Sequence, residues 1–83
     1  MKLEIGKLYN VSRQDNIPFY LFSNIELTAD KKALVLSDQT IMLLSDKIEL
    51  SWGGNAYKIL TETGDVGYIY ENNSVKLVFT AIS

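Results

Sequence analysis

The sequence predicts an all-β fold, and three observations lead to this prediction. β-branched and aromatic residues occur in short runs that turn-forming residues separate, which is typical of strands. No stretch repeats its apolar residues with the period of an amphipathic helix. The segment 57–70 contains two apolar arms around Thr63-Gly64-Asp65, which is the pattern of a β-hairpin. With 83 residues, the chain is expected to form a single domain over residues 1–83.

The hairpin at 57–70 is the segment around which we expect the other strands to pack. Successive side chains of a strand point to opposite faces, so Tyr57 and Ile59 share one face. On the second arm, Gly67 lies on the core face and Tyr68 and Tyr70 lie on the other. The turn between the arms requires a backbone conformation with positive φ, which we expect at its glycine, residue 64.

The remaining strands are predicted from apolar runs between turn residues. Residues 8–11 and 19–22 have strand propensity, and Pro18 marks a loop or a sheet edge because proline cannot donate to a ladder. Residues 33–36 and 41–44 are apolar throughout, which suits short strands that are covered on both faces. Residues 48–52 alternate between apolar and polar. After a polar turn at 71–74, residues 75–79 form the predicted last strand and 80–83 a tail. Shorter extended segments are expected at 3–5 and 25–27. The predicted interior consists of Leu8, Leu34, Leu36, Ile41, Leu43, Ile59, Ile69 and Val75.

Composition excludes several kinds of chemistry. The chain has no cysteine and no histidine, so it lacks thiolate ligands, disulfides, and the commonest metal ligand and general base. Its aspartates fall in predicted turns, and no spacing requires two of them to converge. We therefore expect no catalytic residue, no metal site and no cofactor, and the protein is not expected to be an enzyme.

Net charge and hydropathy limit where the protein is expected to be located and which class of partner it is expected to bind. The net charge is −2, with eight basic and ten acidic residues spread along the chain, so nucleic acid is not the expected partner. No signal peptide is recognisable at residues 1–4, and no apolar run is long enough for a transmembrane helix. We expect a soluble cytoplasmic protein that does not bind membranes.

Aromatic side chains are the candidates for a partner-binding surface. Trp52, the only tryptophan, precedes two glycines, and it is either an exposed anchor or a residue packed on the flank of the domain. Tyr20 lies in an aromatic run that either projects toward a partner or fills the interior. Tyr9, Tyr68 and Tyr70 form a hypothetical outer aromatic cluster.

The central hairpin and its flanks resemble an SH3-like barrel. The features that carry the resemblance are an apolar pair before the distal turn, then Gly67-Tyr68-Ile69, a polar turn, and Val75-Lys76-Leu77. Segment 33–44 is similar to the diverging turn and second strand of the family, and Leu8-Tyr9 occupies the place of its Ala-Leu-Tyr-Asp-Tyr motif. The resemblance covers about residues 8–77 and implies a small barrel of five or more antiparallel strands. Solitary domains of this type occur in bacteria and their phages, which implies an accessory factor of such an origin.

Several positions depart from the peptide-binding members of that family. Ala56 stands in place of the groove tryptophan, Tyr70 in place of the proline after Gly-Tyr-Ile, and Ser74 in place of the tyrosine before the last strand. Val11 replaces the second tyrosine of the first motif, and only Tyr9 is kept. Binding of proline-rich peptides is therefore not expected.

These observations favour a non-enzymatic protein-interaction module, acting on an unknown protein partner as a monomer or a weak homo-oligomer. The expected binding surface contains Tyr9, Tyr20, Trp52, Tyr68 and Tyr70. Two alternatives stay open. A nucleic-acid-binding small barrel would gather Lys2, Lys7, Lys58 and Lys76 on one face. A structural subunit would form homo-oligomers through an open sheet edge.

Overall fold

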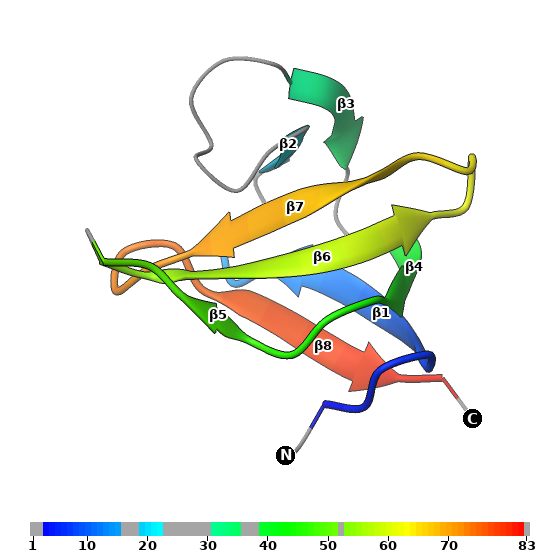
Figure 1. Cartoon of the computed structure of the whole chain (residues 1–83), viewed down its shortest axis with the longest axis horizontal. Helices are drawn as coiled ribbons and strands as arrows, with labels where there is room; N and C mark the ends of the chain where they lie inside the picture. Colours follow the sequence, from blue (N-terminus) through cyan, green and yellow to red (C-terminus); the bar gives the residue numbers. More distant parts are fainter. Residues whose placement is uncertain (1–2, 16–18, 23–30, 36–38, 52, 83) are drawn as a thin grey trace.

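A computed structural model describes residues 3–15, 19–22, 31–35, 39–51 and 53–82. These residues form eight strands that pair antiparallel in one sheet (Figure 1). The strands are β1 (Leu8–Arg13), β2 (Phe19–Phe22), β3 (Lys31–Val35), β4 (Gln39–Leu43), β5 (Ile48–Glu49), β6 (Asn55–Thr61), β7 (Val66–Glu71) and β8 (Leu77–Ala81). Their order in the sheet is β3-β2-β7-β6-β4-β1-β8, and β5 pairs with β6 beside this path.

The sheet curls around a single core. In Figure 1, β6 and β7 lie on one side of the interior and β1 and β8 on the other, and β4 joins them by pairing with both β6 and β1. The described residues contain no helix, so the predicted all-β fold with five or more antiparallel strands is confirmed. The sheet does not close, because β3 and β8 stand at its two ends and no pairing joins them within the described residues. The architecture is that of a small antiparallel sheet domain compatible with a β-barrel fold.

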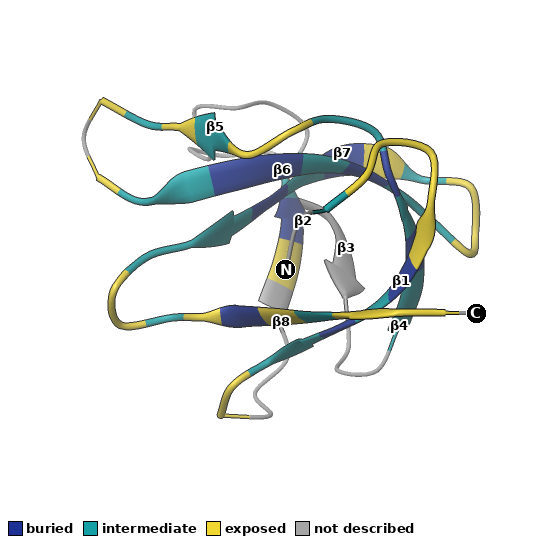
Figure 2. Cartoon of the chain, turned by 90° about the horizontal axis from the view of Figure 1, so that it is seen from below, coloured by how far each residue is buried: buried dark blue, intermediate teal, exposed yellow. Residues whose placement is uncertain are grey.

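The core is built from the inward faces of five strands and the start of β8. Four predicted interior residues, Ile41, Leu43, Ile59 and Ile69, are fully buried as expected. Figure 2 shows how the buried segments of β1, β6, β7 and β8 surround one interior. The complete cluster consists of Tyr9, Val11, Leu21, Ile41, Leu43, Tyr57, Ile59, Ile69 and Leu77, with Leu3 and Phe79 packed against it.

The prediction that Leu8 and Val75 lie in the interior is wrong. Leu8 is 45% exposed while its neighbour Tyr9 is 2% exposed, so β1 turns the face opposite to the predicted one toward the core. Val75 is only half-buried, and Leu77 is the buried residue at the start of the last strand. The side chain of Leu34 and the whole of Leu36 lie outside what the structure describes.

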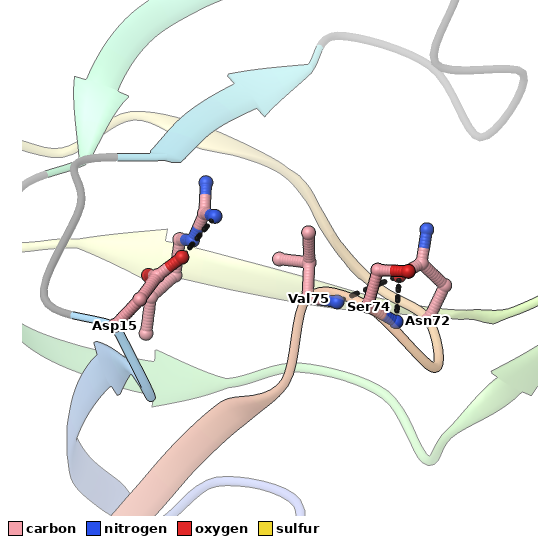
Figure 3. A network of polar contacts seen from close by, with 5 residues as sticks. Asp15, Asn72, Ser74 and Val75 are labelled. Atoms are coloured by element: carbon pink, nitrogen blue, oxygen red, sulfur yellow. Dashed lines mark hydrogen bonds and ion pairs between the residues drawn. The ribbon is translucent and has the colours of Figure 1, made fainter.

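The last strand starts later than predicted because a side chain holds the preceding turn. The Asn72 Oδ1 atom accepts the backbone N–H groups of Ser74 at 2.8 Å and Val75 at 2.7 Å, as Figure 3 shows. The turn keeps residues 72–75 out of the ladder, so pairing begins at Leu77 and continues through residues that the sequence suggested were a tail.

Other boundaries shift by a few residues. Residues 3–5 form no strand, and the chain turns there instead, with Lys7 N–H donating to Glu4 O at 3.3 Å. The strand predicted at 48–52 is reduced to Ile48–Glu49, whereas β2 has the predicted bounds. The prediction for 25–27 falls outside the described residues.

The central hairpin has the predicted register. Tyr57 pairs with Ile69 and Ile59 with Gly67, which places all four on the core face. Thr61 N–H donates to Asp65 O at 2.8 Å across the turn, and the glycine within that turn, residue 64, has a φ of +91° as predicted.

Candidate interaction surface

The outer face of the sheet carries a row of apolar side chains that crosses four strands and ends at the residue after β8. Val66 on β7 pairs with Leu60 on β6, Leu60 pairs with Met42 on β4, and Met42 pairs with Leu8 on β1. Ile82 continues the row after β8, because its N–H donates to Leu8 O at 3.3 Å. We call these five residues the apolar row.

The members of the apolar row are outside because their strand neighbours are inside. Tyr9, Ile41 and Ile59 face the core, so the residues that alternate with them face away from it. Leu8 and Ile82 are each 45% exposed and Val66 is 36% exposed, while Met42 and Leu60 are half-buried. Large apolar side chains that are exposed next to one another indicate a contact surface rather than a random scatter.

A shallow hollow of about 280 Å³ lies over the middle of the apolar row. Its lining residues are Leu8, Thr40, Ile41, Met42, Leu60, Thr61 and Glu62. A polar line runs beside the row, since Thr40 pairs with Asn10 and Asn10 pairs with Thr80. Glu62 stands at the rim, where its Oε1 accepts Thr40 N–H at 3.0 Å. An apolar hollow with a polar rim has the anatomy of a protein contact site.

Aromatic side chains from β2 and β7 adjoin the apolar row. Phe22 pairs with Tyr68, and Tyr20 and Tyr70 lie two residues further along the same outer faces. Tyr20 is 44% exposed and the other three are half-buried. We call these four residues the aromatic patch. Val66 and Tyr68 are alternate residues of β7, so the patch and the row are continuous on one face.

Hydrogen bonds orient one tyrosine of the aromatic patch. The Tyr70 hydroxyl donates to Gly53 O at 3.2 Å and accepts a hydrogen bond from Asn72 Nδ2 at 3.2 Å. These bonds hold the ring between the β5–β6 loop and the turn before β8, so the aromatic patch is anchored at this end.

The structure brings together three of the five residues that the sequence suggested for partner binding. Tyr20, Tyr68 and Tyr70 all belong to the aromatic patch. The expected position of Tyr9 in an outer cluster is wrong, because its ring lies in the core with its centroid 6.1 Å from that of Phe79. Its hydroxyl accepts Glu4 N–H at 2.7 Å. Trp52 lies outside the described residues.

The sequence reasoning missed the apolar row. Its members come from five separate segments, and each looks like an ordinary strand residue by itself. The one usable signal was the alternation around Leu8, where polar Asn10 and Ser12 share its face and Val11 shares the face of Tyr9. The pairing that aligns the row is a property of the fold, because strand register cannot be derived from one strand alone.

A half-buried polar corner next to β8 has a structural role. Glu71 Oε2 accepts the Tyr57 hydroxyl at 2.9 Å and Asn55 Nδ2 at 3.5 Å, and its Oε1 accepts Leu77 N–H at 3.3 Å. Burial, together with the hydrogen bond to Glu71, raises the pKa of Tyr57 well above its ordinary value of 10.0. The phenol is therefore neutral at physiological pH, and Glu71 links strands β6, β7 and β8.

Within the described ranges, acidic side chains do not gather in groups of three or more that could hold a metal ion. None of the described segments forms a helix with the length and apolarity that a membrane span requires. The Lys7 Nζ atom lies 2.6 Å from Glu4 Oε2, and Lys58 and Lys76 belong to parts of the sheet that β4 and β1 separate. Lys2, the remaining lysine of the nucleic-acid alternative, is outside the described residues.

Comparisons with known proteins assign the chain to no family, so its class is defined by its fold. The chain matches no protein-family model, and searches of the curated proteins and of the solved structures return no match for it. The function is therefore argued from the surface of the molecule itself.

Proposed function

We propose that this chain is a non-enzymatic protein-interaction module of SH3-like architecture, whose contact surface is the apolar row with the adjoining aromatic patch. The hairpin β6–β7 supports the SH3-like part of the proposal, because it lies at the segment that resembles the family's distal hairpin. As in the solitary domains that it resembles, the partner would be a bacterial or phage protein in the cytoplasm.

The observation that carries the proposal is the apolar row itself. Five positions at inter-strand spacings of about 4.8 Å give a row about 19 Å long. The fold does not need apolar residues at these positions, because the core has its own set on the opposite face. Three of the five residues remain more than a third exposed in the isolated chain. A partner that covers the row would remove this surface from water.

Two other binding modes have less support. At the position that resembles the groove tryptophan of peptide-binding SH3 domains, Ala56 is fully buried and cannot stack on a proline-rich ligand. For nucleic acid, Lys7 is paired with Glu4, and Lys58 and Lys76 are separated across the sheet, so these lysines supply little of the continuous basic footprint that such binding needs.

The test is affinity capture from a bacterial host with four forms of the chain as bait. The row variant carries Leu8→Ser and Val66→Ser, and the patch variant carries Tyr20→Ser and Tyr68→Ser. The matched control is Ile5→Ser, which replaces a residue that is 57% exposed and lies outside both surfaces. Each variant is first checked for a native spectrum by NMR.

We expect the wild type and the control to capture the same protein, identified by mass spectrometry, and the row variant to lose it. Loss with the patch variant as well would extend the contact onto β2 and β7. Capture of the same protein at the same level by all four forms would contradict the proposal.

A further inference from the structure

The sheet ends at β8 with an edge that is open within the described residues. Strand β8 pairs with β1 on one side, and no described strand pairs with its other side. An open edge presents backbone N–H and C=O groups that can pair with a strand of another chain. The edge is therefore a candidate binding site that does not depend on the apolar row.

Three hydrogen bonds made by backbone groups show in which direction the residues of β8 point their N–H and C=O groups. Ile82 N–H donates to Leu8 O, and Gln14 N–H donates to Lys76 O, so the even-numbered residues direct their backbone polar groups toward β1. Leu77 N–H points the other way and donates to Glu71 Oε1. Because backbone direction alternates along an antiparallel strand, Phe79 and Ala81 direct their N–H and C=O groups away from the sheet.

The two ends of the sheet differ in how they are protected against pairing. Strand β3 begins with Lys31 and Lys32, and lysine on an edge strand opposes pairing with another edge. Strand β8 has the sequence Leu-Val-Phe-Thr-Ala, without a charge, a proline or a glycine. Of the two edges, β8 is the one suited to accept another strand.

Phe79 adds an apolar contribution beside this edge. Its ring packs on the core, with centroid distances of 5.0 Å to Tyr57 and 6.1 Å to Tyr9, but the residue remains half-exposed. A strand added next to β8 would cover the remaining surface of this ring.

We propose that a second copy of this chain pairs with β8 in antiparallel orientation, with the two-fold axis at Phe79. Because the axis passes through Phe79, odd-numbered residues stand opposite odd-numbered residues, so outward groups meet outward groups in the two copies. The Phe79 residues exchange two hydrogen bonds, and each Ala81 N–H donates to Leu77 O of the other copy. Glu71 already occupies Leu77 N–H and thereby marks one end of the ladder.

A second copy fits this edge better than a charged partner would, because both sides then supply the same uncharged strand. The two Phe79 rings stand opposite each other as a cross-strand aromatic pair, which is a favourable arrangement in antiparallel sheets. The contact is one strand wide, and interfaces at the low end of the size range are weak. The dimer is therefore expected at high concentration and not at low concentration.

Two neighbouring proline substitutions test the proposal. Ala81→Pro removes an outward N–H and leaves the bonds to β1 intact. Ile82→Pro is the matched control, because it removes an N–H that donates to β1 and leaves the outward edge unchanged. Sedimentation velocity follows the mass of each form from about 10 µM to about 1 mM, which are dissociation constants of a weak association. Amide hydrogen exchange by NMR is measured at both ends of this range, and the urea midpoint of each variant shows that it is folded.

The expected result is that the wild type and Ile82→Pro shift from the 9.4 kDa monomer toward twice that mass as concentration rises, while Ala81→Pro stays monomeric. Exchange at the amides of Phe79 and Ala81 slows with concentration, whereas Val78 and Thr80 are protected throughout. A wild type that remains monomeric at the highest concentration overturns the proposal. So does a dimer that Ala81→Pro leaves intact, or protection of Phe79 and Ala81 already at the lowest concentration. None of these outcomes bears on the proposal that the apolar row captures a partner, which is tested separately.

Discussion

Replacing Gly67 with valine tests the packing between the central hairpin and β2. A Cβ atom at Gly67 would lie 2.6 Å from the backbone oxygen of Phe22, and 2.7 Å and 2.9 Å from the Cγ and Cδ1 atoms of Leu21. The Leu21 side chain is fully buried, and the Phe22 oxygen belongs to the backbone. Neither can yield without moving β2, which within the described residues pairs with β7 at Phe22 and Tyr68.

The size of the effect follows from a comparison with Gly64. Overpacking of a core typically costs about 1–3 kcal/mol, and valine adds two methyl groups beyond the colliding Cβ, so we expect Gly67→Val to lie at the upper end of that range. The strand propensity of valine offsets at most about 1 kcal/mol of this overpacking cost. Gly64→Ala meets no atom within 4 Å, and its only cost is the φ of +91°. A Cβ in this left-handed conformation costs roughly 1 kcal/mol, which is less than the net cost of about 2 kcal/mol that overpacking leaves at Gly67.

Urea denaturation of the wild type and of both variants measures this difference. We expect Gly67→Val to lower the free energy of unfolding by more than Gly64→Ala does, out of a total on the order of 5 kcal/mol for a domain this small. The slope against urea should stay constant, because the same surface is exposed on unfolding. A loss for Gly67→Val that is equal to or smaller than the loss for Gly64→Ala would refute the assignment of Gly67 to the core face.

Two further predictions concern Tyr57 and peptide binding. Because the folded state keeps Tyr57 neutral, its contribution to stability is complete below the ordinary pKa of 10.0 and is lost as pH rises above it. Between neutral pH and about pH 11 the wild type should therefore lose about 1.4 kcal/mol more stability than Tyr57→Phe, almost all of it above pH 10, measured as urea midpoints. Equal losses would show that the phenol is not the responsible group. Proline-rich peptides should cause no saturable NMR shifts, and shifts at Tyr9 and Tyr70 during a titration would contradict this prediction.

The central hairpin could be predicted because local chemistry determines it. A turn with a glycine in the left-handed conformation, flanked by two arms of opposite alternation, specifies both the register and the faces. Gly67 could be assigned to the core face for the same reason, although its collision partner, Leu21, comes from a distant segment. Local pattern was sufficient here because both strands and their turn are contiguous in the sequence.

Strand β1 shows where local pattern fails. Leu8 and Tyr9 are both apolar, so the sequence alone does not decide which of them faces the core. The structure places Tyr9 inside, where Glu4 N–H satisfies its hydroxyl and Phe79 packs against its ring. Glu4 and Phe79 both lie outside β1. Which of Leu8 and Tyr9 faces the core therefore depends on tertiary contacts. The apolar row could not be predicted for the same reason, because Leu8 belongs to the row only if Tyr9 is the residue that faces the core.

The start of β8 could not be predicted for a different reason. Residues 75–79 have strand propensity, but Asn72 binds the amides of Ser74 and Val75 and holds the chain in a turn there. A side chain that binds nearby amides in this way competes with extended structure, and the sequence shows only that the residue is polar. Glu71 binds both the Tyr57 hydroxyl and the amide of Leu77, a link that becomes visible only when β6, β7 and β8 are placed together.

The apolar row is difficult to explain by stability alone. Full burial of a large aliphatic side chain contributes about 1.5–3 kcal/mol, but a residue such as Leu8 that remains 45% exposed gains only part of this. Serine at Leu8 or Val66 would therefore reduce the stability of the isolated chain far less than a comparable change at Ile41 or Ile59, which are almost fully buried. If capture of a partner depends on Leu8 and Val66 while the free energy of unfolding hardly does, the row is maintained by binding. If the two change together, the row belongs to the core, and the site must be sought on the aromatic patch.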